Sequence, residues 1–149
     1  MMKTYVFPAV VEQHPSTGRY VVVFPDLPEV ITNGENLQDA SCNAWINLGF
    51  RLYHMEEEHI AIPEASDPSS IVKPEDAKII TVEVDMLVVR QALDNKSVKK
   101  IVTLPKWLIA LGKENNINFS RVLRRALKEE LGIYDEETGF LPLLTDIFR

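Results

Sequence analysis

The sequence predicts an α+β protein made of two parts, and three observations carry this prediction. Stretches rich in β-branched and aromatic residues alternate with turn residues, and one long helical pattern follows them. A strand pattern and two shorter helical patterns come after residue 95. The charge changes at the same place: residues 1–95 carry six basic and 15 acidic side chains, whereas residues 96–128 carry nine and one. We therefore expect two domains, 1–94 and 95–149.

The first domain begins with a predicted β-hairpin. Residues 3–12 and 19–24 have strand composition, and the turn residues 14–18 separate them. Pro8 has no backbone N–H, so we expect the first strand to lie at a sheet edge or to carry a bulge there. A short third strand is expected at 30–32, before the strong turn signal of an Asn-Gly pair.

A long helix should begin after Asn36, which is a good N-cap, and Asp39 is placed to bond back to the chain before it. The helix should end near residues 56–58, three glutamates that we expect to be exposed and available to a partner, because acidic groups are unfavourable at a helix C-terminus. Its apolar positions share one face: Leu37, Ala40, Ala44, Leu48, Leu52 and Met55.

The rest of the first domain is predicted to be a loop, a strand and a short helix. Residues 61–77 contain three prolines and are expected to form a surface loop. Residues 78–85 are predicted to be a strand, with strict alternation in their second half, and 86–94 favour a short helix. The order β-β-β-α-β describes one helix packed on a mostly antiparallel sheet.

The basic region is predicted to form one strand and two helices. Residues 98–104 alternate, and Pro105 can open a helix over 106–115. The second helix should have Ser120 as its N-cap and should stop at Gly132. The residues expected to face inward are Trp107, Leu108, Leu111, Val122, Leu123, Ala126, Leu127 and Leu131.

Such a segment is too small to bury its apolar residues alone, and its single strand has no partner within the segment. Two copies solve both problems if their strands pair antiparallel and the four helices enclose one core. The outer face of this two-stranded ribbon would present Lys99, Ile101 and Thr103 from each chain, and a ribbon fits the major groove of DNA. Lys100 adds charge, and the start of the second helix suits a phosphate. The predicted DNA contacts are Lys99, Lys100, Ile101, Thr103, Asn118, Ser120 and Arg121.

The stretch KKIVTLP with the two following helices resembles the ribbon-helix-helix family of DNA-binding proteins. Ile101 departs from the family pattern, which usually has a polar residue there. Ile101 can contact a thymine methyl, or it can weaken base recognition and leave mainly phosphate contacts. An ordinary β-α-α appendage is the alternative interpretation of the segment.

The first domain resembles the HicB antitoxin family through VVFPDLPEVITNGENLQDA and the long helix behind it, with Glu29-Val30 where Gly-Cys is common. The resemblance implies a partial RNase H-like fold without nuclease activity. It also implies a homodimer that binds the operator of its own operon and a small, basic, HicA-like RNA-cleaving toxin. A larger hetero-oligomer with the toxin is compatible with this arrangement. The acidic first domain suits a basic partner. Asp26 and Glu29 are the predicted toxin contacts, and the alternative interpretation is that the prolines beside them simply stiffen a turn.

Other functions have weaker support in the sequence. A nuclease needs clustered carboxylates that hold two metal ions, and only Asp26, Glu83 and Asp85 are candidates. We expect no catalytic residue, no metal site and no cofactor, because nucleotide-binding, Ser-His-Asp and CxxC motifs are absent. A stand-alone DNA-binding regulator whose first domain senses a small ligand remains the alternative, and a deep pocket beneath the long helix would favour it.

The compartment is expected to be the cytoplasm. The sequence shows no signal peptide and no apolar run long enough to cross a membrane. Cys42 is the only cysteine and is expected to be a small core residue. The tail, 133–149, is apolar enough to dock on another surface, but the sequence does not identify that surface.

Overall fold

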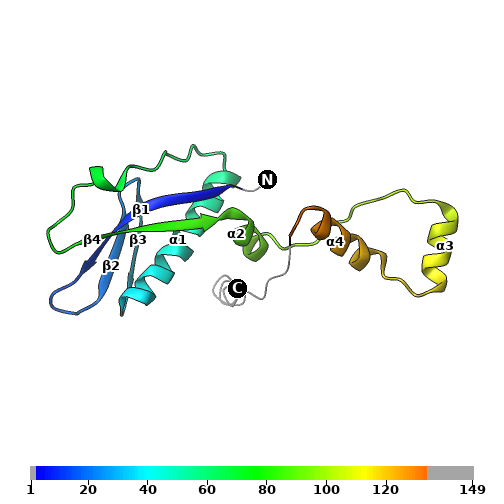
Figure 1. Cartoon of the computed structure of the whole chain (residues 1–149), viewed down its shortest axis with the longest axis horizontal. Helices are drawn as coiled ribbons and strands as arrows, with labels where there is room; N and C mark the ends of the chain where they lie inside the picture. Colours follow the sequence, from blue (N-terminus) through cyan, green and yellow to red (C-terminus); the bar gives the residue numbers. More distant parts are fainter. Residues whose placement is uncertain (1–2, 134–149) are drawn as a thin grey trace. The chain divides into compact units, whose positions relative to one another are not determined.

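The computed structural model describes residues 3–133, and the chain divides into two compact units after Asn95 (Figure 1). The prediction made for the apolar tail falls outside these residues. The first unit is α+β, as predicted. It consists of β1 (Thr4–Gln13), β2 (Tyr20–Phe24), β3 (Leu27–Gly34), α1 (Leu37–Glu57), the short 3-10 helix η1 (Pro68–Ser70), β4 (Lys78–Asp85) and α2 (Met86–Leu93). The second unit contains α3 (Lys106–Glu114) and α4 (Phe119–Glu130).

The four strands form one antiparallel sheet in the order β3-β2-β1-β4. β1 therefore lies inside the sheet, and the prediction that Pro8 places it at the edge is wrong for the strand order. β4 pairs with residues 4–11 of β1, whereas β2 pairs only with residues 10–13. Pro8 is consequently paired on one side only, with Thr81, so its missing N–H is tolerated inside an interior strand.

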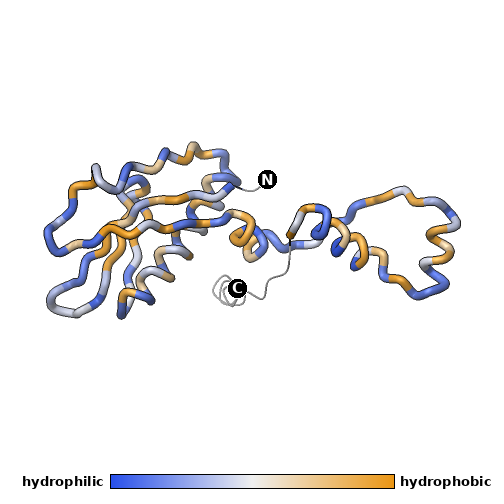
Figure 2. Tube along the Cα trace, in the orientation of Figure 1, coloured by the Kyte–Doolittle hydropathy of each residue, from blue (hydrophilic) through white to orange (hydrophobic). Residues whose placement is uncertain are grey.

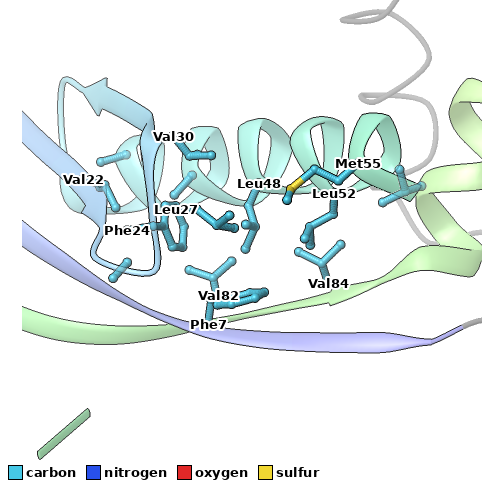
Figure 3. Close-up of a cluster of buried hydrophobic side chains, with 14 of the residues drawn as sticks. Phe7, Val22, Phe24, Leu27, Val30, Leu48, Leu52, Met55, Val82 and Val84 are labelled. Carbon is cyan, nitrogen blue, oxygen red and sulfur yellow. The ribbon is translucent and has the colours of Figure 1, made fainter. Parts of the chain in front are cut away.

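Helix α1 covers one face of the sheet and encloses the core with it (Figure 3). Leu48 and Leu52 from the helix are fully buried against strand residues such as Phe7, Phe24 and Val84. The predicted stripe of α1 is confirmed from Ala40 onwards, whereas Leu37 in the first turn is exposed. Cys42 is half-buried.

The start of α1 follows the predicted chemistry. The side chain of Asn36 accepts a hydrogen bond from the backbone N–H of Asp39 at 2.8 Å, and Asp39 accepts one from the N–H of Glu35 at 2.9 Å. Gly34 lies directly beneath the first turn, where an added Cβ would meet the backbone N of Ala40 at 2.2 Å. The chain can enter α1 this closely to β3 only because residue 34 has no side chain.

The hairpin turn, β4 and α2 also form where the sequence places them, and Gly18 has a φ of 71°. β3 is longer than predicted. Its pairing with β2 extends from Leu27 to Gly34, so the two residues expected to make a turn lie inside the strand. Cross-strand pairing has overridden the local turn preference there.

The helices of the second unit match the prediction, with Asn116 and Gly132 at positive φ angles of 55° and 68° after α3 and α4. Figure 2 shows apolar residues along both helices. The strand predicted over 98–104 is not formed in the single chain. A strand requires a hydrogen-bonded neighbour, and the second unit offers none among the described residues.

Candidate interaction surfaces

The residues predicted to contact DNA are accessible in the single chain. Lys99, Lys100 and Thr103 are exposed, and 82% of the surface of Ile101 is exposed. These residues carry two positive charges and one large apolar side chain on a segment without secondary structure. The arrangement offers backbone and side-chain groups to a second chain or to a nucleic acid.

The second unit has an apolar groove of about 750 Å³ in place of a core. Its walls come from residues 100–104, from Leu108 and Leu111 on α3, and from residues of α4 such as Val122 and Leu123. No residue of α3 or α4 is fully buried. Two amphipathic helices that leave their apolar faces in contact with water form only part of a core.

Three of the residues predicted to face inward lie outside this groove. Trp107 is 67% exposed, and Leu127 and Leu131 are also exposed. The prediction is therefore wrong for these residues in the single chain, because the two helices alone enclose only one side of the groove. Gly112 lets α3 and α4 approach each other, since a Cβ added at Gly112 would lie 2.7 Å from the Phe119 ring.

The N-terminus of α4 differs from the prediction by two residues. Asn118 is the N-cap, because its side chain accepts a hydrogen bond from the N–H of Arg121 at 3.1 Å. Ser120 lies within the first turn and does not cap the helix. The predicted contacts Asn118, Ser120 and Arg121 are nevertheless brought together at one helix end, where backbone N–H groups remain without helical partners.

The predicted toxin contacts Asp26 and Glu29 already have partners within the fold. Asp26 lies between β2 and β3, and its two carboxylate oxygens accept hydrogen bonds from the N–H and the hydroxyl of Ser66. Glu29 pairs with Arg51 of α1 at 3.0 Å. A hydrogen bond to its own backbone N–H, with a smaller contribution from Arg51, lowers the pKa of Glu29. Of the two, Glu29 remains the more accessible.

The candidate nuclease carboxylates do not converge on one place. Asp26 is bound to Ser66, and Asp85 caps α2 by accepting from the N–H of Leu87 at 2.9 Å. Glu83 lies on β4 with Asp85, and two strands, β1 and β2, separate β4 from β3 in the sheet. Among residues 3–133, no three acidic, histidine or cysteine side chains are grouped to hold a metal ion.

Sequence reasoning missed a cluster around Arg90. The glutamates of residues 56–58 were expected to be exposed, but the Arg90 guanidinium of α2 binds both Glu56, at 3.2 Å, and Glu57. Tyr5 also donates its hydroxyl hydrogen to Glu56 at 3.0 Å. Glu57 and Glu58 are exposed, as predicted, whereas the expectation is wrong for Glu56, which is half-buried because both Arg90 and Tyr5 bind its carboxylate. The signal available in the sequence was Arg90 itself, a single basic residue in the short helix predicted over 86–94.

No helix within residues 3–133 is long and apolar enough to cross a membrane.

The chain is similar to several solved structures. It is 28% identical to a chain of the toxin–antitoxin complex from Streptococcus pneumoniae, with a TM-score of 0.54, over 86% of this chain and 99% of that one. It is 26% identical to the antitoxin HicB of Burkholderia pseudomallei, with a TM-score of 0.49, over 89% of this chain and 98% of that one. No curated protein matches the chain.

The family model of the HicB-like antitoxins of bacterial toxin–antitoxin systems matches residues 6–88, more than half of the chain. The matched residues include the long helix and nearly all of the four-stranded sheet described above. The chain therefore belongs to the HicB-like antitoxin family.

Proposed function

We propose that this antitoxin neutralises a HicA-like ribonuclease toxin by direct binding and represses its own operon by binding operator DNA. It performs both tasks by binding, without catalysis. Residues 1–94 form the toxin-binding domain, with a partial RNase H-like fold, and residues 95–149 form a ribbon-helix-helix domain. Membership of the antitoxin family supports the first task.

The apolar groove of the second unit is the observation that carries the proposal for DNA binding. A second copy of the chain supplies the apolar surface that the groove lacks and the strand that residues 98–104 need as a neighbour. The result is a homodimer, and toxin binding to it creates a larger hetero-oligomer. The paired strands place Lys99, Ile101 and Thr103 of both chains on one ribbon for the major groove.

Charge supports the division of tasks between the two units. Residues 1–95 carry a net charge of −9, which favours encounter with a basic toxin. Residues 96–128 carry +8, which favours DNA through the release of counterions. The proposed phosphate contacts are Lys100 and, at the start of α4, Asn118, Ser120 and Arg121. Asp26 and Glu29 are proposed toxin contacts.

DNA binding is tested by fluorescence anisotropy with a duplex from upstream of the gene and an unrelated duplex as the control. We expect tighter binding to the upstream duplex and an affinity that falls linearly in log[salt]. Thr103→Ala should cost about 1–3 kcal/mol on the upstream duplex if Thr103 contacts a base. Lys99→Ala should also weaken binding, whereas Lys73→Ala, an exposed lysine of the first unit, should not. Equal affinity for both duplexes would exclude operator recognition.

Dimerisation is tested by sedimentation of two matched variants. Leu111→Asp places a charge in the groove and should shift the chain towards a monomer, because the charge would be buried in the dimer. Trp107→Asp changes a more exposed residue of the same helix outside the groove and should leave the dimer largely intact. Identical behaviour of the two variants would show that the groove is not the dimer interface.

Toxin neutralisation is tested with the short basic protein that we expect to be encoded beside this gene. The full-length antitoxin should form a stable complex with that protein and should inhibit its RNA cleavage. A chain that neither binds nor inhibits the protein is not its antitoxin.

A ligand-sensing regulator is the second candidate, and the packing beneath α1 gives it no support. Ala44, Leu48 and Leu52 have no exposed surface and fill the space between the helix and the sheet.

A further inference from the structure

Strand β1 has an unpaired edge over its first half. β4 pairs with β1 from Thr4 to Val11, whereas β2 pairs only from Val10 to Gln13. Residues 4–9 therefore have a strand neighbour on one side only. Because the polar backbone groups of a strand point alternately to its two sides, part of those in residues 4–9 face a side without a strand.

The segment 60–66, here named the strap, runs from the end of α1 to the turn between β2 and β3 and is fixed at both ends. At one end the N–H of Ile60 donates to the carbonyl oxygen of Met55 at 2.8 Å. At the other end the N–H of Ser66 donates to Asp26 at 3.0 Å. His59 turns the chain into the strap with a φ of 55°, a left-handed conformation that histidine tolerates better than most residues.

A groove of about 700 Å³ lies between the unpaired edge of β1 and the strap. Its walls are residues 3–7, Met55 and Glu56 of α1, and residues 59–65. No backbone hydrogen bond joins residues 61–65 to β1. The volume is in the range of about 300–1,000 Å³ that is usual for ligand sites. The strap is thus held beside the edge without pairing with it.

We propose that this groove binds an extended peptide segment of the toxin, which adds to β1 as a strand along residues 4–7. This inference rests on the function proposed above and specifies the surface used. An unpaired strand edge offers a repeating row of backbone donors and acceptors, and an extended polypeptide is the ligand that matches such a row. Val6, which is 46% exposed, offers an apolar side chain to the added segment, and Ile62 lies in the groove wall.

Charge identifies the source of the added strand as a basic protein. The first unit carries −9, and Glu64 adds an acidic group to the wall of the groove. The one lysine in the wall, Lys3, lies over the ring of Tyr5 at 5.0 Å. A second copy of this acidic unit would be repelled, whereas lysine and arginine residues beside the added strand would be attracted.

Substitutions that fill the groove should weaken binding of the toxin. Ala65→Trp and Ala61→Trp place a large side chain at exposed positions of the groove wall and should each weaken toxin binding by the full-length antitoxin at least about ten-fold. Ser70→Trp adds the same side chain at an exposed position outside the groove and should leave the affinity unchanged. Circular dichroism of all three variants confirms that they are folded.

Hydrogen exchange measures the added strand directly. With wild-type antitoxin, binding of the neighbouring basic protein should slow the exchange of backbone amides in residues 4–7. If that protein binds normally to both groove variants, or if residues 4–7 exchange at the same rate in the complex, the groove is not the toxin site although the antitoxin function stands. If the wild type does not bind the protein at all, the proposed function itself fails and the inference fails with it. If Ala65→Trp instead abolishes self-association, the occupant is a second copy and the inference is wrong.

Discussion

Both carboxylate oxygens of Asp26 accept hydrogen bonds from Ser66, a residue 40 positions later in the chain. Asp26 lies in the turn between β2 and β3, and Ser66 ends the strap. The pair therefore fixes the far end of a segment that would otherwise be tethered only to α1. Residues 61–65 have no backbone hydrogen bonds of their own to hold them.

Loss of this pair should loosen the strap. We expect Asp26→Ala to lower the free energy of unfolding by about 1–3 kcal/mol, because a charge-assisted hydrogen bond is lost. Ser66→Ala should cost less, and the double variant should cost less than the sum of the two, since they remove the same interaction. Urea denaturation checks these values. Asp76→Ala, at an exposed aspartate, is the control, and additive costs for the pair would contradict the expectation.

Arg90 should contribute far more to the stability of the fold than Arg51, although each forms an ion pair that involves a residue of α1. The Arg90 side chain is 18% exposed, binds Glu56 and Glu57, and lies 4.9 Å from the centre of the Tyr53 ring. The pair of Arg51 with Glu29 is more exposed. We expect Arg90→Ala to cost about 1–3 kcal/mol of unfolding free energy and Arg51→Ala less than about 1 kcal/mol. Chemical denaturation of both variants measures the difference, and equal costs would refute it.

Gly34 should tolerate no side chain. In Gly34→Ala the new Cβ would meet the backbone N of Ala40 at 2.2 Å, so β3 or the first turn of α1 must move. We expect a loss of about 1–3 kcal/mol in unfolding free energy. Gly18→Ala meets no close neighbour but has a φ of 71°, and it should cost about 1 kcal/mol from backbone strain alone. Thermal unfolding followed by circular dichroism ranks the two, and a smaller loss for Gly34→Ala would contradict the contact.

Tyr5 should make the fold less stable at alkaline pH. Burial, and then the hydrogen bond and negative charge of Glu56, raise the pKa of Tyr5 above its ordinary value of 10.0. Between pH 10.0 and the raised pKa, the folded chain keeps a proton that the unfolded chain has released, so the stability contributed by this group is complete below pH 10.0 and declines as pH rises above it. Tyr5→Phe should reduce this decline. Denaturation midpoints between about pH 9 and 11 test it, and parallel curves for wild type and variant would exclude Tyr5 as the cause.

Much of the local structure is predictable because it depends on residues within a few positions of each other. Asn36 caps α1 through the N–H of Asp39, and the positive φ angles of Gly18 and Gly132 end a turn and a helix as their residue type predicts. β4 has the predicted bounds, and its burial alternates strictly in its second half, as the sequence does. For α4 the same reasoning chose Ser120 as the cap, although Asn118 performs the same chemistry two residues earlier.

The sequence by itself determined the α+β class, the order of the elements, the contrast in charge between the two units and the resemblance that the family match confirms. The tertiary structure decided which side chains are already engaged. Arg90 neutralises glutamates that looked free, and Asp26 holds the strap. It also decided that β1 keeps an unpaired edge, because strand register is fixed by partners far away in the sequence. The strand at 98–104 does not form in the single chain, because a strand needs a hydrogen-bonding neighbour. In the dimer proposed here, that neighbour belongs to the second chain.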